Sequence, residues 1–266
     1  MRRTKEIYQI DSFADQPFTG NPAAVCLLEE FPPDLWMQSF AAEMNLSETA
    51  FVCPSHNGFQ LRWFTPTTEV DLCGHATLAA AHALWESGRL PLNEMACFQT
   101  LSGDLQAELR DGQIELDFPA EPPIPQHPSA KLLACLSHSP ISIAKNRMDY
   151  LVELSNELEV GEIEIDLDEL AKIPIRGLIV TAHAKNPEYH FVSRFFAPSV
   201  GVDEDPVTGS AHCCLAPYWG DKLGLKCLNA YQSSARGGKL SLRLTDDRVI
   251  LGGTAQTIFK GELTID

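Results

Sequence analysis

One segment of this chain occurs twice, in a shorter and a longer form. Arg62-Trp-Phe-Thr-Pro66 precedes the shorter form, Asp71–Thr77, and Arg194-Phe-Phe-Ala-Pro198 precedes the longer form, Glu204–Cys213. In each copy the pattern predicts a β-strand, a loop marked by proline, and a helix that opens with glycine, a polar residue and alanine. A repeat of this length is too long for a stacked solenoid unit, so the chain is expected to consist of two related halves.

The two helix starts are candidate anion-binding sites. The first N–H groups of a helix have no partner within the helix, and the aligned peptide dipoles leave partial positive charge there. Gly74 and Gly209 let a ligand approach the backbone, while His75, Thr208 and Ser210 can add side-chain hydrogen bonds. Two such starts facing each other across a cleft between the halves would hold a small carboxylate. Either copy alone is equally well an ordinary loop-to-helix junction, but the recurrence with the same flanks favours a site.

Charge and composition exclude several classes of partner. A formal net charge of −16 argues against binding to nucleic acid or to an anionic membrane, because either needs a basic surface. The N-terminus is basic but no apolar block follows, and no later segment is long enough to span a bilayer, so a cytoplasmic protein is expected.

The eight cysteines lack the regular spacing of a disulfide framework and are expected to be reduced and mostly structural. Cys73 differs, because a thiolate can be stabilised immediately before a helix start.

Apolar periodicity predicts an α+β fold that is rich in strands. Gly74–Glu86 is apolar nearly all round and rich in alanine, which predicts a buried helix enclosed by a sheet. A second central helix is expected from Gly209 towards Gly224, with a kink at Pro217, and Pro119–Pro128 is expected to link the halves. Further helices are expected at residues 33–45 and 167–172. Strands are expected at residues 5–13 and 23–28, in a segment that begins at residue 50, and at residues 59–64, 96–100, 105–109, 113–118, 141–144, 150–154, 178–182, 190–196, 239–244, 248–251 and 257–265.

Glu48 lies between the end of a predicted helix and the apolar strand that begins at Ala50. A carboxylate at the mouth of a strand can be partly desolvated, which raises its proton affinity and suits a general acid/base. From position alone, a surface glutamate in a loop is the alternative.

Two further kinds of site find little support in the sequence. His75 and His82 fall near one face of the first buried helix, but the sequence places no third ligand beside them, so no metal is predicted. Neither helix start carries the lysine of a nucleotide-binding P-loop.

Four motifs in chain order resemble the phenazine-biosynthesis PhzF-like family, and the likeness covers essentially the whole chain. They are Asp11-Ser-Phe13 with Thr19-Gly-Asn-Pro22, then Asn45–Ala50, Leu72-Cys-Gly-His75 and Glu204–Ser210. The resemblance implies a diaminopimelate-epimerase-like fold of two pseudo-symmetric halves. Each half is then a mainly antiparallel, barrel-like sheet around a central α-helix, with the active site between them. The halves are expected at residues 1–118 and 119–253, with a strand from 254–266 returning to the first half.

The resemblance also implies cofactor-independent proton transfer on a small, cyclic carboxylate, as in isomerisation of a dihydro-hydroxyanthranilate. The expected partner is this small-molecule substrate, with no cofactor and no metal, and the resemblance further implies a homodimer. The implied site consists of Glu48 as the general acid/base and of His75, Asp205, Ser210, Gly74, Gly209 and Thr208 for substrate binding.

Two-base epimerases of the same superfamily use one cysteine at each helix start. Cys73 keeps the first position, but Thr208 replaces the second, and a hydroxyl is far too weak an acid for this chemistry. A two-thiol racemase or epimerase is therefore not predicted. A non-catalytic member that retains the fold and binds a small molecule or a protein remains the alternative, because a fold does not prove a function. The two hypotheses differ in whether Glu48 lies in a closed cleft or projects into open solvent.

Overall fold

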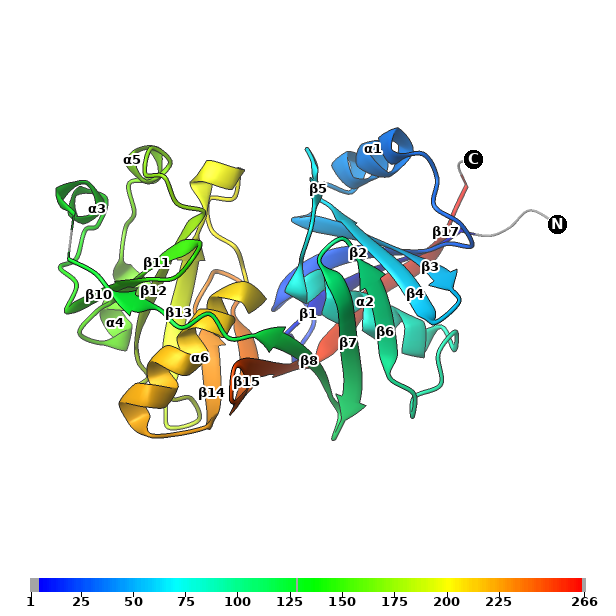
Figure 1. The fold of residues 1–266 in the computed structure, drawn as a ribbon. Helices are drawn as coiled ribbons and strands as arrows, with labels where there is room; N and C mark the ends of the chain where they lie inside the picture. Colours follow the sequence, from blue (N-terminus) through cyan, green and yellow to red (C-terminus); the bar gives the residue numbers. More distant parts are fainter. Residues whose placement is uncertain (1–4, 128, 265–266) are drawn as a thin grey trace. The chain divides into compact units, whose positions relative to one another are not determined.

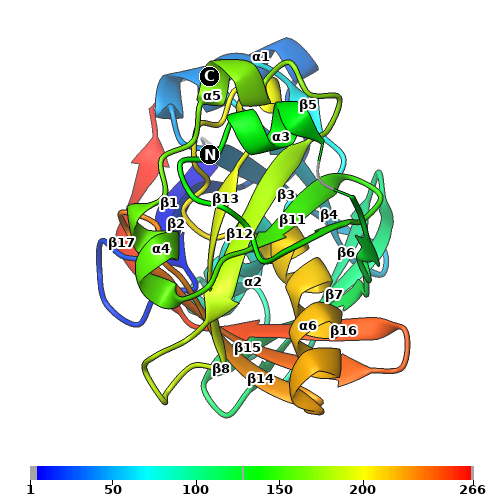
Figure 2. The ribbon, with the colours of Figure 1, turned by 90° about the vertical axis from the view of Figure 1, so that its left-hand side faces the viewer.

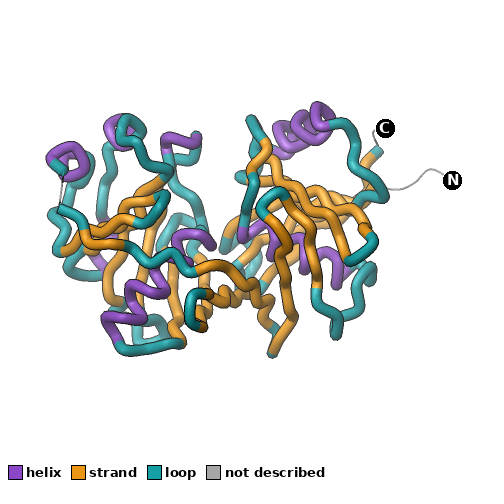
Figure 3. The backbone as a smooth tube through the Cα atoms, viewed as in Figure 1, coloured by secondary structure: helices purple, strands orange, loops and turns teal. Residues whose placement is uncertain are grey.

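A computed structural model describes residues 5–127 and 129–264. The chain divides into two compact units, Met1–Asp117 with Gly252–Asp266, and Phe118–Leu251. Each unit has more residues in strands than in helices, and each contains one long helix, α2 (Gly74–Glu86) or α6 (Gly209–Leu223), that is mostly buried (Figure 3). The α+β fold class expected from the sequence is confirmed.

The first unit contains a sheet in the order β17-β1-β2-β3-β4-β6-β7-β8 (Figure 1). Two neighbouring pairs, β2 with β3 and β4 with β6, are parallel, and the other pairs are antiparallel. The last strand of the chain therefore lies beside the first. The elements are β1 (Lys5–Ser12), β2 (Asn21–Leu27), α1 (Asp34–Met44), β3 (Glu48–Ser55), β4 (Gly58–Phe64), β5 (Glu69–Val70), α2 (Gly74–Glu86), β6 (Ala96–Thr100), β7 (Gly103–Arg110), β8 (Gln113–Pro119) and β17 (Ala255–Leu263).

The second unit repeats this pairing pattern. Its strands run in the order β10-β11-β12-β13-β14-β15, and successive pairs are antiparallel, parallel, antiparallel, parallel and antiparallel, as in β1-β2-β3-β4-β6-β7. The repeat seen around the two helix starts therefore extends through each unit. The elements are β9 (Ile124–Pro125), α3 (Ala130–Ala134), β10 (Ser142–Lys145), β11 (Asp149–Glu153), α4 (Glu157–Glu162), α5 (Leu167–Leu170), β12 (Gly177–His183), β13 (Phe191–Phe196), η1 (Pro198–Val200), α6 (Gly209–Leu223), β14 (Cys227–Gln232), β15 (Gly238–Thr245) and β16 (Arg248–Gly253).

Helix α2 is the enclosed centre of the first unit. Ten of its thirteen residues are buried, and it packs against β1, β2, β3, β7 and β17. Its alanines let strands approach the helix backbone closely from several sides. The opposite face of the strands carries α1, where Met37 and Phe40 pack on Cys26 and Phe51. Because both faces of these strands are covered, β2 and β3 are continuous apolar segments instead of alternating ones.

The second unit has the same two layers. Val152, Leu178 and Val180 pack beneath α3, α4 and α5, which lie over the strands in Figure 2. On the other face, the indole N–H of Trp219 in α6 donates to Thr181 Oγ1 at 3.0 Å. Helices α3 and α4 and the strands β9 and β14 were not predicted, because such short elements carry little periodicity of their own.

Helix α6 continues through Pro217 because another segment replaces the missing donor. Proline has no N–H, so the carbonyl of Cys213 loses its partner within the helix. The backbone N–H of Glu121 donates to that carbonyl at 2.9 Å. The segment predicted as a linker is thereby attached to the side of α6.

The same ion pair precedes both central helices. Arg62 donates two hydrogen bonds to the carboxylate of Glu69, both at 2.7 Å, and Arg194 donates two to Glu204 at 2.7 and 2.9 Å. Each guanidinium also lies over a phenylalanine ring two residues further on. The pair fixes the loop that leads into each helix.

All eight cysteines are free, and six of them are buried. Among the described residues, no helix has both the length and the hydropathy needed to cross a membrane.

An enclosed α2 predicts a large cost for any enlarged side chain on it. Ala80 is fully buried, so Ala80→Leu should destabilise the protein by about 1–3 kcal/mol through overpacking. The matched control is Ala130→Leu on the exposed face of α3, which should leave stability nearly unchanged. Urea unfolding followed by circular dichroism measures both, and an unshifted midpoint for Ala80→Leu would contradict the enclosure.

Candidate active site

Glu48 is placed by the left-handed end of α1. Asn45 adopts φ 50° and ψ 38°, and its N–H donates to the carbonyl of Ala41. Asparagine tolerates this conformation better than most residues, so the chain can turn sharply out of the helix. Strand β3 then begins at Glu48, opposite Ala23 of the parallel strand β2. The carboxylate thus lies at the mouth of a strand, as the sequence predicted.

A tight turn before β2 brings Asn21 to the same place. Gly20 has φ +68°, and a Cβ there would lie 2.1 Å from the carbonyl oxygen of Ser12, so only glycine fits. The turn sets Asn21 opposite Ser12 in the sheet. The hydroxyl of Ser12 in turn donates to the carbonyl of His75 at 2.7 Å. This end of the sheet therefore holds the first turn of α2.

The imidazole of His75 joins these groups. Its Nδ1 lies 3.2 Å from Nδ2 of Asn21, whose Oδ1 accepts a hydrogen bond from Ser47. An amide nitrogen only donates, so Nδ1 accepts, and the proton is on Nε2. Nε2 lies 3.3 Å from Oε2 of Glu48 and 3.4 Å from the hydroxyl oxygen of Ser47, so its proton faces both groups. Burial lowers the pKa of His75 to about 3, so the ring is neutral at physiological pH.

Glu48 does not project into open solvent, because only 18% of its side chain is exposed. Its carboxylate, the thiol of Cys73 and the ring of His75 offer ligand atoms that all lie within 4.8 Å of one another. From the sequence, no third ligand was expected beside His75 and His82. This was wrong for His75, whose neighbours come from a different strand and from the residue before the helix.

The cluster does not have the arrangement of a single metal site. Cys73 Sγ lies 3.5 Å from Nδ1 of His75, whereas Glu48 contacts Nε2 on the other side of the ring. One ion binds only one ring nitrogen, so these contacts fit a hydrogen-bonded acid/base group better. His82 belongs to another group, with Glu86 and Thr257.

In the second unit the predicted residues are gathered by Gln232. The hydroxyl of Thr208 donates to Oδ2 of Asp205 at 2.5 Å. The fully buried side chain of Gln232 accepts from the N–H of Thr208 and donates to the carbonyl of Asp205. No sequence signal indicated Gln232, which is one polar residue at the end of a strand. Gly209 and Ser210 follow in the first turn of α6.

Neither central helix has a side-chain cap at its start. The first N–H groups of α2 and α6 are therefore not satisfied by the residues that usually do so, and each start keeps its capacity for an anion. The structure thus brings Glu48, Gly74 and His75 together in the first unit, and Asp205, Thr208, Gly209 and Ser210 together in the second.

The strand register shows how the two copies differ. Thr49 pairs with Phe64, and Leu178 pairs with Phe196, so Gly177 occupies the position of Glu48 in the second unit. A Cβ on Gly177 would lie 2.4 Å from the ring of Phe195. Only the first unit carries a carboxylate at this position.

At the level of the fold, the chain is similar to a hydroxyproline epimerase from Agrobacterium vitis. The TM-score is 0.63 at 10% identity, with 98% of this chain and 93% of the epimerase covered. A phenazine biosynthesis PhzF family protein from Enterococcus faecalis is far more similar, with a TM-score of 0.94 at 40% identity over 99% and 100% of the two chains. The architecture is therefore that of PhzF proteins and of epimerases.

Sequence comparison gives the family. A protein of Halalkalibacterium halodurans named as an uncharacterized isomerase is 50% identical over 264 residues, covering 98% of this chain and 99% of that protein. The human phenazine biosynthesis-like domain-containing protein is 40% identical over 284 residues, covering 97% and 98%. The family model described as phenazine biosynthesis-like protein matches residues 10–261, and the chain belongs to this family.

The buried, neutral His75 predicts a pH dependence. Its pKa is lowered in the folded protein and is about 6.5 when unfolded, so its contribution to stability is complete above about pH 6.5 and is lost as pH falls towards 3. Imidazole signals of ¹⁵N-labelled His75 should keep the Nε2–H tautomer from pH 8 to pH 5. A titration midpoint near 6.5 would contradict the assignment.

Proposed function

We propose that this protein is a cofactor-independent isomerase that moves a proton on a small, cyclic carboxylate, with Glu48 as the general acid/base. The observation that carries the proposal is the contact of the mostly buried Glu48 carboxylate with the neutral imidazole of His75 at 3.3 Å. Membership of the phenazine biosynthesis-like family and the relatives named as isomerases support the reaction class.

In this reaction the carboxylate of Glu48 removes a proton from an acidic carbon of the substrate. The electron pair of the broken C–H bond moves into the neighbouring unsaturated system, and the protonated Glu48 returns the proton to a different atom. No electron is gained or lost overall, so one carboxyl group is sufficient. The substrate carbon must come within about 3–3.5 Å of a carboxylate oxygen for this transfer.

His75 positions Glu48 and tunes its basicity. With Nε2–H 3.3 Å from Oε2, the imidazole can orient the carboxylate towards the substrate. The hydrogen bond is stronger to the charged than to the protonated carboxyl, so it stabilises the form that abstracts the proton. A cationic histidine would hold Glu48 ionised too strongly, and burial of the ring prevents this charge.

We further propose that the start of α2 binds the substrate carboxylate through the N–H groups of Gly74 and His75. In the second unit, Asp205, Thr208, Gly209 and Ser210 are proposed as substrate ligands, with Gln232 as a positioning residue. Thr208 is not proposed as a base, because its hydroxyl already donates to Asp205. The mechanism therefore has one base, unlike that of the two-thiol epimerases.

Removal of the acid/base should abolish proton transfer without removing the binding site. The protein is incubated in deuterium oxide with a panel of small cyclic and amino carboxylates, and carbon-bound deuterium is followed by NMR. Glu48→Gln should lower the exchange rate about 10²–10⁴-fold, the usual contribution of a general acid/base. The control is Glu43→Gln on the exposed face of α1, which should retain the full rate.

Two outcomes would contradict the proposal. Equal exchange by Glu48→Gln and the unchanged protein would show that another group moves the proton. No exchange with a compound that demonstrably binds would instead favour a non-catalytic binding protein of this fold.

A further inference from the structure

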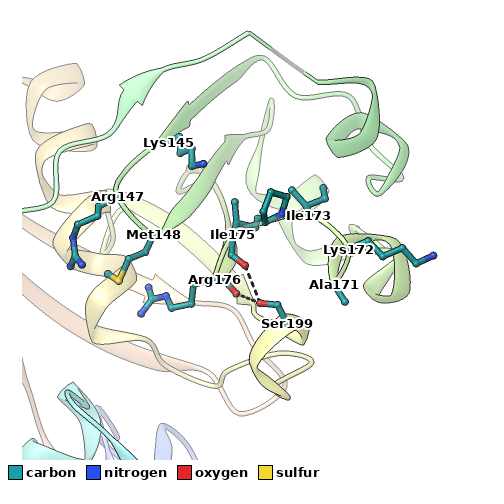
Figure 4. A pocket seen from close by; sticks show the side chains of 10 residues that line it. Lys145, Arg147, Met148, Ala171, Lys172, Ile173, Ile175, Arg176 and Ser199 are labelled. Atoms are coloured by element: carbon teal, nitrogen blue, oxygen red, sulfur yellow. Dashed lines mark hydrogen bonds between the residues drawn. The ribbon is translucent and has the colours of Figure 1, made fainter.

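A second group of polar side chains lines a hollow of about 570 Å³ in the second unit (Figure 4). It opens between the turn that follows β10, the loop before β12 and the short helix η1. Of the described residues that line it, four are basic and none is acidic. This is the opposite of the chain as a whole, whose formal net charge is −16.

Two arginines in this hollow are each held by a carboxylate along one edge of the guanidinium group. Arg176 donates through Nε and Nη2 to the fully buried carboxylate of Asp149, at 2.9 and 2.5 Å. Arg147 donates through the same two nitrogens to Oε1 of Glu121, at 3.3 and 2.9 Å. Within the described part of the chain, neither arginine uses Nη1 in a hydrogen bond. Each guanidinium therefore keeps two N–H donors for a ligand.

The two side chains lie on the same side of the hollow, with the side chain of Met148 between them (Figure 4). Lys145 lies at the rim, where its ammonium group is 5.0 Å from the centre of the Tyr150 ring. Lys172 lies at the opposite end and pairs with Glu169, so it contributes little to the arginine side.

The positions of the arginines in the repeat correspond to those of two site residues in the first unit. Ala23 pairs with Glu48, and Asp149 pairs with Gly177 in the equivalent strands. Arg147 lies two residues before Asp149, as Asn21 lies two before Ala23. Arg176 precedes Gly177 as Ser47 precedes Glu48. Where the first unit has the two neutral side chains that surround His75, the second unit has two cations.

We propose that this pocket binds a small organic anion, with a carboxylate or phosphate group against Nη1 of Arg147 and Arg176. Arginine forms short, charge-assisted hydrogen bonds with such groups, and its attachment to Glu121 or Asp149 limits the entropy lost on binding. The walls beside the cations are apolar, from Met148, Ile173 and Ile175. The ligand therefore has an apolar body next to its charge.

The test separates charge from apolar contact with three probes. Benzoate carries both features, benzamide keeps the body without the charge, and inorganic phosphate keeps the charge without the body. Titration of ¹⁵N-labelled protein should show benzoate shifting amide signals of residues 145–149, 173, 175 and 176. Phosphate should shift a subset of the same signals more weakly, and benzamide should cause little change.

Variants assign the binding to the pocket. Arg147→Gln should weaken benzoate binding at least fivefold, and Lys145→Gln should weaken it to a smaller degree. Arg110→Gln is the matched control, because Arg110 is a half-exposed arginine paired with Glu108 in the first unit. Arg176 is left unchanged, since its removal would leave the buried carboxylate of Asp149 without its ion-pair partner and could unfold the protein.

The proposal is overturned if benzoate shifts signals elsewhere, if benzamide binds as tightly, or if Arg147→Gln binds benzoate unchanged. These measurements need no turnover, so they stand whether or not Glu48 transfers protons. The source of the anion is decided by the effect of benzoate on deuterium exchange. Competition with the substrate would identify the anion as part of the substrate, and binding without competition would identify a separate ligand.

Discussion

The start of each central helix depends on one arginine that holds the loop ahead of it. Arg62 with Glu69, and Arg194 with Glu204, form two-pronged ion pairs that are mostly shielded from solvent. A planar guanidinium that engages both carboxylate oxygens fixes orientation as well as distance. Each pair lies over an aromatic ring, which further limits its movement. Because the loop is fixed, the first turn of the helix and its unpaired N–H groups are presented in one position.

Much of this arrangement could be predicted from the sequence. The bounds of α2 follow from its alanine-rich, almost entirely apolar segment, and the repeat indicated two related halves with equivalent helix starts. The residues proposed for each half do lie together in their own unit. Prediction failed where the position of a site residue depends on a contact with a side chain from another part of the sequence. Neither the pairing of Arg62 with Glu69 nor the clamp made by Gln232 leaves a pattern in the chain, because each depends on a contact between separate elements. The cluster of Cys73 with Glu48 was missed for the same reason.

The two units share a backbone plan but differ in the chemistry that it carries. In the first, a buried neutral histidine supports a carboxylate, and burial of the ring is what keeps the histidine uncharged. In the second, hydroxyl and amide groups of Thr208 and Gln232 organise the loop that carries Asp205. This difference arises from a few positions, since the pairing of strands and the place of the central helix are the same.

Gly177 shows why the second unit cannot match the first at this position. A side chain at that position would run into the ring of Phe195, and the carbonyl of Phe196 lies 2.9 Å from the same point. A single replacement therefore cannot place a carboxylate at this position, because a large aromatic ring of the core occupies the space. Such a carboxylate would need a smaller residue in place of Phe195 as well, at a cost in packing. The two units thus share an architecture, while the packing of the second excludes the side chain that the first carries at the equivalent position.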